Sequence, residues 1–221
     1  MTFAVMEPEI IFEDHYLLVI NKPSGMASEG NLESAEMWAY DHVCQQVRQK
    51  NNFLQLMHRL DKPASGLLLL AKTKKAALFI QQQIEQRALI KKYRCLVPGD
   101  ARSLSGKIEH FLARDEKGYK SMVVIADYPK AQLAVLEVLS VDYMEQNNQS
   151  LIHVQLHTGR YHQIRCQLSF LGFPVMGDGL YAPDLWEDYR HIALHAESLE
   201  LEHPKTREGM VLEAKPEGSW W

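Results

Sequence analysis

Five consecutive apolar residues, Leu67 to Ala71, restrict the fold of this chain more than any other segment. A short unbroken apolar run is typical of a strand that is buried on both faces, since a half-exposed strand alternates apolar and polar residues. Pro63 and Gly66 come just before it and predict turns rather than a regular helix. The sequence therefore predicts a buried strand that follows a turn.

The other segments combine strands with a few helices. We expect a hairpin from residues 10–12 and 16–20, and a helix from Ser34 to Lys50. A helix capped by Thr73 should run to about Gln86, and another should start near Tyr161 and stop at Gly172. The remaining expected strands are 93–97, 121–126, 131–141, 151–156, 196–201 and 210–213. Strands in runs with few helices predict the α+β class, and no linker divides residues 1–221, so we expect one domain.

Composition excludes some classes of protein. The chain is 46% hydrophobic and 24% charged, as in ordinary globular proteins, and no window approaches 18 unbroken apolar residues, so no membrane span is expected. Residues 1–15 lack the pattern of a signal peptide. The three cysteines, Cys44, Cys95 and Cys166, match no metal or disulfide spacing. These features predict a cytoplasmic protein.

The net charge of −4 is unevenly distributed. Residues 58–183 carry 17 Lys and Arg against 11 Asp and Glu, whereas both flanking segments are acidic. Residues 72–94 hold seven Lys and Arg against one Glu. This segment has the composition of a phosphate-binding surface, and equally that of a solvated, lysine-rich helix face.

The first candidate for chemistry is Asp61, within the run HRLDKPASG at residues 58–66. A carboxylate fixed beside Arg59 and Lys62, immediately before a buried strand, meets the requirements of a nucleophile held in its ionised form. A turn aspartate that accepts backbone N–H bonds has the same local sequence. The residues alone leave both interpretations open.

A second polar run, HTGRYHQIR, occupies residues 157–165. Gly159 fits a tight turn before a helix, on which His162 and Arg165 would share a face. Such a face can bind phosphate or hold a carboxylate, and it can also be simply solvated.

Taken together, the two runs resemble the signatures of the RluA family of pseudouridine synthases. HRLDKPASGLLLLAK resembles the family's catalytic signature, and LHTGRYHQIRCQLSFLGFPVMGDGLYA its second long signature. Weaker matches lie in family order at residues 19–25, 91–99 and 194–204. The resemblance implies a mixed, mostly antiparallel sheet with flanking helices and a central cleft.

The resemblance also implies residue roles. Asp61 matches the catalytic aspartate, Arg165 the arginine that pairs with it, and Tyr93 the tyrosine that packs against the target base. Arg59 matches the arginine that enters the RNA stack after the uridine has left it. Asp61 attacks the base, attacks the sugar or assists glycosidic elimination, and the resemblance leaves these three open. The other expected RNA contacts are His58, Lys91, Lys92, Arg160 and His162.

The implied reaction isomerises a uridine in rRNA or tRNA after base flipping. It needs no cofactor and no metal, and we expect a monomer. Ala64, Leu133 and Gln167 depart from the usual family residues, which affects subfamily placement rather than the reaction. The family-like part begins at Ile10, so we expect no N-terminal S4 domain.

Two other classes of protein compete with this interpretation. One is a non-catalytic RNA-binding protein that retains the fold, which a pseudouridine assay would distinguish. The other is a metal-dependent hydrolase that uses some of the ten histidines, although their spacings match no common site.

Overall fold

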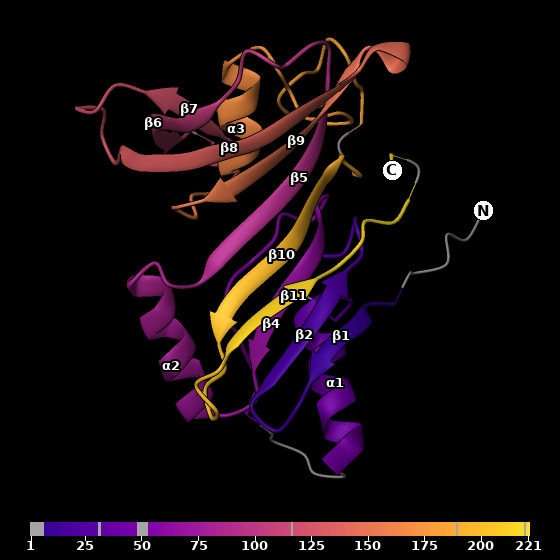
Figure 1. The fold of residues 1–221 in the computed structure, drawn as a ribbon, viewed down its shortest axis with the longest axis vertical. Helices are drawn as coiled ribbons and strands as arrows, with labels where there is room; N and C mark the ends of the chain where they lie inside the picture. Colours follow the sequence, from indigo (N-terminus) through magenta and orange to yellow (C-terminus); the bar gives the residue numbers. More distant parts are fainter. Residues whose placement is uncertain (1–6, 31, 48–52, 116, 189, 219) are drawn as a thin grey trace. The chain divides into compact units, whose positions relative to one another are not determined.

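The computed structural model describes residues 7–30, 32–47, 53–115, 117–188, 190–218 and 220–221 (Figure 1). The chain divides into two compact units. Unit 1 comprises Met1–Ile90 and His195–Gly218, and unit 2 comprises Lys91–Leu194 and Ser219–Trp221. Within the described residues, no helix is both long and apolar enough to cross a membrane. The expectation of one domain stays a prediction.

Unit 1 contains a mixed sheet in the order β1-β2-β4-β10-β11. Most neighbouring strands are antiparallel, but β4 and β10 are parallel, with Gly66 opposite Ala196. A short strand, β3, pairs with the end of β4. The strands are β1 (Glu9–Glu13), β2 (Leu17–Lys22), β3 (Gln55–Leu56), β4 (Ser65–Ala71), β10 (Leu194–Glu202) and β11 (Gly209–Glu213).

The predicted buried strand is β4, whose seven residues are all buried. Both of its faces are covered, which explains why the apolar run is unbroken. Helix α2 (Lys74–Glu85) packs on one face, where Ile80 joins a core with Leu67 and Leu69. The Thr73 side chain caps α2 by accepting from the backbone N–H of Ala76, as predicted. Helix α1 (Ala35–Val47) is also as expected up to Val47, and residues 48–50 lie outside the described part of the chain.

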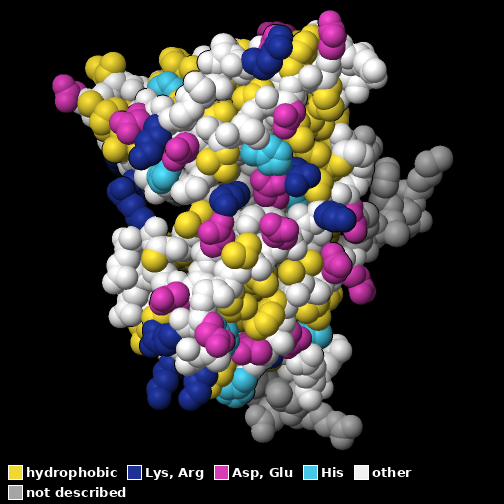
Figure 2. Space-filling model, viewed as in Figure 1, with side chains coloured by type: hydrophobic (Ala, Val, Ile, Leu, Met, Phe, Trp, Pro, Cys, Tyr) yellow, Lys and Arg dark blue, Asp and Glu magenta, His cyan; other side chains and the backbone are white. Residues whose placement is uncertain are grey.

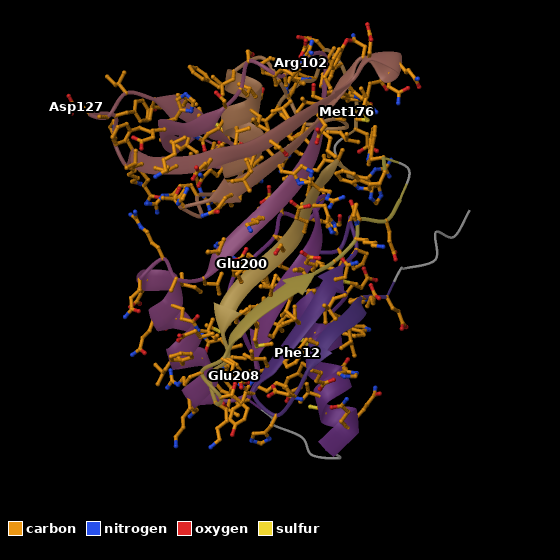
Figure 3. The ribbon with its side chains drawn as sticks, in the orientation of Figure 1. Phe12, Arg102, Asp127, Met176, Glu200 and Glu208 are labelled. Atoms are coloured by element: carbon orange, nitrogen blue, oxygen red, sulfur yellow. The ribbon has the colours of Figure 1, made fainter. Side chains whose placement is uncertain are left out.

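Unit 2 contains an antiparallel sheet in the order β5-β9-β8-β6-β7. A 3-10 turn, η1 (Glu145–Asn147), connects β8 to β9, and Asp127, labelled in Figure 3, lies between β7 and β8. The strands are β5 (Ile90–Pro98), β6 (Gly106–Arg114), β7 (Ser121–Val124), β8 (Gln132–Met144) and β9 (Gln149–Leu156). The sequence did not predict β6.

Helix α3 (Gln163–Phe170) packs on the unit 2 sheet, where its Cys166 joins Leu112 of β6 and Ala134 of β8 in a small core. The sequence predicted that this helix starts near Tyr161, but it begins at Gln163. The reason is the backbone of His162, whose φ of 51° lies in the left-handed region and interrupts the helical path. His162 therefore precedes the helix that carries Arg165, which corrects the expectation that both lie on it, and both side chains contact Tyr181. The two units together confirm the α+β class, with a mixed sheet and few helices, and the central cleft stays a prediction.

Candidate active site

The turn that carries Asp61 is braced by a second loop from the end of β2. The Ala64 N–H donates to the Asp61 carbonyl oxygen at 3.1 Å, which closes the turn. Ser28 bonds both backbone groups of Leu60, at 2.7 and 3.0 Å. From the same loop, the Ser24 hydroxyl donates to the Pro63 carbonyl and the Gly25 N–H to the Lys62 carbonyl. These bonds fix the backbone on both sides of Asp61.

Lys22 lies beneath this turn with no exposed surface. Its ammonium nitrogen, Nζ, contacts carbonyl oxygens of both loops at 2.6 to 3.4 Å, namely those of Pro23, Met26, Lys62 and Ala64. Burial lowers the pKa of Lys22 to about 7, and the negative charge of Asp61 raises it. Lys22 is therefore a buried cation that both interacts with Asp61 and ties its turn to the neighbouring loop. The sequence analysis did not single it out.

The neighbours of Asp61 have unequal environments. Arg59 is exposed and pairs with Glu29 at 2.7 Å, with 66% and 47% of the two side chains accessible. His58 is half-buried, and its Nε2 accepts from the Leu69 N–H at 3.3 Å, beside the point where the Met57 N–H donates to the Leu69 carbonyl. His58 therefore supports the edge of β4, and its contact with RNA stays a prediction.

In unit 2, Arg165 and Asp178 form a fully buried ion pair. Arg165 Nε donates to Asp178 Oδ2 at 2.6 Å, and Nη2 donates to Oδ1 at 2.8 Å, so the contact is bidentate. The side chains are 1% and 0% exposed. The guanidinium carbon of Arg165 also lies 5.2 Å from the centre of the Tyr181 ring. Asp178 thus fixes the plane of the guanidinium, and the sequence analysis had not given it this role.

Buried Gln163 organises the turn before α3. Its side-chain oxygen accepts from the Thr158 hydroxyl at 2.8 Å and from the Arg160 N–H at 3.0 Å. The Arg160 guanidinium donates from Nε to the Leu133 carbonyl at 2.9 Å. His162 Nδ1 lies 3.2 Å from the Tyr181 hydroxyl, which also accepts from the Ser121 N–H.

The remaining predicted residues of unit 2 lie at the start of β5. Tyr93 is 6% exposed and pairs with Val154 of β9. Lys91 and Lys92 are half-buried, and burial lowers the pKa of Lys91. Unit 2 thus holds Tyr93 and Arg165, whereas unit 1 holds Asp61, and the meeting of Asp61 with Arg165 stays a prediction.

Basic side chains gather at one end of unit 1. Figure 2 shows Lys and Arg in dark blue at the lower left, over α2 and the turn between β10 and β11. The exposed basic residues of these segments are Lys74, Lys75, Arg87, Lys205 and Arg207, which we call the α2 patch. Among the described residues, no three His, Cys, Asp or Glu side chains are grouped to hold a metal ion.

Comparison with known proteins places this geometry in context. The family model described as RNA pseudouridylate synthase matches residues 16–170. The dual-specificity RNA pseudouridine synthase RluA of Pasteurella multocida is 33% identical over 210 residues, which cover 94% of this chain and 93% of the relative. The uncharacterized RNA pseudouridine synthase YlyB of Bacillus subtilis is 34% identical over 95% of this chain and 69% of its own length.

A solved structure also resembles this fold. Human RNA pseudouridylate synthase domain containing 4 aligns with a TM-score of 0.75 and 26% sequence identity. The alignment covers 94% of this chain and 88% of the human chain.

Proposed function

Because the chain belongs to the RNA pseudouridylate synthase family, whose members isomerise uridine to pseudouridine in RNA, we propose that Asp61 is its catalytic residue. The bracing of its turn is the observation that supports this assignment most directly. Four carbonyl oxygens surround the ammonium of Lys22, and two of them, from Lys62 and Ala64, follow Asp61 in the chain. A turn held this way fixes the backbone position of Asp61 before the substrate binds, which is what a covalent or electrostatic catalyst requires.

The reaction needs little from the protein beyond binding, positioning and proton transfer. The bond between uracil N1 and the ribose C1′ breaks, the base turns, and a bond forms between C5 and C1′. C5 loses a proton and N1 gains one, so atoms and electrons balance without an oxidant or a hydrolytic water. The protein is accordingly an isomerase, and we propose that it uses no cofactor.

We propose that Arg165 and Tyr93 complete the site. Asp178 accepts from Nε and Nη2 of Arg165. A guanidinium carries five N–H donors, and in this proposal the same group also contacts the carboxylate of Asp61. Tyr93 provides an aromatic wall for the flipped uracil, a contact worth roughly 1–3 kcal/mol per stacked base. The RNA contacts assigned to His58, Arg59, Lys91, Lys92, Arg160 and His162 belong to the same proposal.

We further propose that the target uridine lies in rRNA or tRNA. One relative that matches most of this chain is named for the ribosomal large subunit, which supports rRNA, and another is named for dual specificity, which supports more than one RNA substrate. A monomer in the cytoplasm completes the proposal, and the spacing of the three cysteines, which matches no disulfide framework, suits a reducing compartment.

The decisive experiment compares pseudouridine formation by the wild-type protein and by Asp61→Asn, a nearly isosteric change. RNA from a strain that lacks the gene is mapped for pseudouridine after either version is restored. We expect one or more sites to return with the wild type and none with Asp61→Asn, while the variant still folds and binds RNA. Full activity of Asp61→Asn would exclude Asp61 as the catalytic residue. The absence of any site restored by the wild type would support the non-catalytic RNA-binding alternative.

A further inference from the structure

Arg114, at the end of β6, begins a stacked column of side chains in unit 2. Its guanidinium carbon lies 4.2 Å from the centre of the Tyr161 ring. On the Tyr161 ring, His162 is stacked with a centroid distance of 3.8 Å and an interplanar angle of 19°. A ring stacked so closely covers one face of Tyr161, so Arg114 covers the other. The order of the column is therefore Arg114, Tyr161, His162.

The inner end of the column is fixed by the fold. His162 meets the Tyr181 ring edge-on at 5.8 Å and lies 3.2 Å from its hydroxyl. The Ser121 hydroxyl donates to the Tyr161 carbonyl at 2.6 Å, and the Ser121 N–H donates to the Tyr181 hydroxyl oxygen at 2.8 Å. His162 is held in a left-handed backbone conformation, which an L residue adopts only when its surroundings impose it. The column is consequently preformed rather than adaptable.

The outer end of the column faces solvent among basic and aromatic side chains. Arg114, Lys117 and Lys120 are exposed. Tyr119 is 69% exposed and Tyr161 is 38% exposed. The Asp115 carboxylate, the nearest acid in the chain, accepts from the Tyr119 and Lys120 N–H groups and so shapes the turn between β6 and β7.

This combination has the properties of a nucleobase platform. Unpaired bases of RNA stack on aromatic rings and on the flat face of an arginine guanidinium. A guanidinium that already lies over the Tyr161 ring has little side-chain freedom left to lose when a base covers its outer face. Exposed lysines beside it can contact the flanking phosphates.

We propose that the outer face of Arg114, supported by Tyr161 and His162, binds one unpaired nucleobase of the substrate RNA outside the uridine pocket. This inference rests on the proposed function for its ligand class. It assigns a binding role to Arg114 and Tyr161, neither of which carries a role in the isomerisation. The bound nucleotide is recognised by its π-face, so the site accepts any of the four bases.

The test uses a single-stranded oligoribonucleotide of mixed sequence that contains 2-aminopurine, whose fluorescence is quenched by stacking. We expect the wild-type protein to quench it, and Arg114→Ala to abolish the quenching and weaken binding by roughly 5- to 100-fold. Arg114→Lys is the matched control, because lysine retains the positive charge but lacks the planar guanidinium group. It should behave like Arg114→Ala within about threefold. Tyr161→Phe, which retains the ring, should remain close to wild type, and Tyr161→Ala should lose the quenching.

Two outcomes would overturn the proposal. If Arg114→Lys binds and quenches like the wild type, Arg114 is a phosphate contact rather than a platform. If Arg114→Ala binds and quenches like the wild type, the column serves only the fold. Thermal unfolding of each variant checks that the chain remains folded. Pseudouridine formation by the wild type is measured separately, so a protein that stacks RNA without isomerising it would refute the proposed function alone.

Discussion

The proposed site contains two buried cations, Lys22 and Arg165, and their positive charges are compensated in different ways. Lys22 contacts four carbonyl oxygens and interacts with the negative charge of Asp61. Arg165 has a carboxylate, Asp178, in a bidentate contact. Asp178 balances the charge of Arg165, and among the described residues of unit 1 the buried Lys22 supplies positive charge that acts on Asp61. A buried charge without compensation is costly, so both arrangements are needed for the side chains to stay in place.

The pKa of Lys22 makes this balance measurable. Burial lowers it to about 7, against an ordinary value of 10.5 that applies to the unfolded chain. Between these pH values the unfolded state binds one more proton than the folded state, so the free energy of unfolding gains a contribution that increases with pH. Lys22→Met should remove this contribution, and chemical denaturation at pH 7 and pH 10 measures it.

Asp61→Asn should move the same titration to lower pH, because it removes the negative charge that raises the pKa of Lys22. NMR detection of the lysine side-chain carbons across pH 5 to 11 follows the titration directly. An unchanged or increased pKa of Lys22 in Asp61→Asn would show that the two groups do not interact.

At the residue scale, the sequence indicates candidate residues only where a local run carries the signal, and the roles of these residues stay predictions. The HRLD and HQIR runs indicated Asp61 and Arg165, and the structure places both within hydrogen-bonded frameworks. Lys22 and Asp178 were missed because their role depends on partners that are distant in sequence. Lys22 reads as the polar end of an apolar strand, and only the fold reveals that it is completely buried.

At the scale of elements, the parallel pairing of β4 with β10 depends on Gly66. Its φ of 116° is a value that glycine adopts readily and other residues rarely do. A Cβ added here would lie 2.4 Å from the backbone nitrogen and oxygen of Ala196. This pairing begins at Ser65, directly after the turn that carries Asp61, so it also fixes where that turn ends. The Pro-Gly signal predicted a turn here, but not the close approach of a second strand.

Gly66→Ala should therefore destabilise unit 1 by about 3 kcal/mol or more, because backbone strain adds to overpacking. Gly30→Ala is the matched control, since its φ of 103° is similar and nothing lies within 4 Å of the added carbon. It should lose only about 1 kcal/mol. Urea unfolding of both variants measures the difference, and equal losses would show that the contact with Ala196 can relax at no cost.

Elements whose apolar residues recur with a regular period were predictable from the sequence, and the other elements were not. Helix α2 combines a capping threonine with an apolar stripe, and its bounds agree with the prediction. Strand β6 mixes Lys107, Glu109 and His110 with apolar residues, and it is buried mainly at Leu112 and Ala113. Its place between β7 and β8 comes from pairing, which a single segment does not encode. The start of α3 was misplaced because a left-handed histidine has no signature in the sequence.

For the whole molecule, the distribution of charge matters more than the net value of −4. RNA binding depends on local phosphate contacts, and the α2 patch is the basic surface of unit 1 that Figure 2 displays. Arg207 in this patch lies over Phe79 of α2, with 3.6 Å between its guanidinium carbon and the ring centre. Exposed Glu85 and Glu208, the latter labelled in Figure 3, lie in the same segments, so the surface is basic without being uniform.

Lys74 and Lys75 occupy the first turn of α2, which contains no acidic residue. Cations there oppose the helix dipole and cost about 0.3–1 kcal/mol each, so a fold optimised for stability alone would not favour them. We predict that Lys74→Gln/Lys75→Gln stabilises the protein slightly and weakens RNA binding. The slope of log K against log salt should fall by about 1.5, as expected for two lost phosphate contacts.

The matched control is Gln82→Glu/Gln86→Glu, which changes the net charge by the same amount at the other end of the helix region. Its salt slope should stay close to that of the wild type, whereas its stability should not increase. Fluorescence anisotropy with a labelled RNA between 50 and 300 mM salt, roughly the range over which such contacts lose most affinity, gives the slopes. An unchanged slope in the lysine variant would mean that these residues form a solvated helix face, and the phosphate contacts of unit 1 would then have to lie elsewhere.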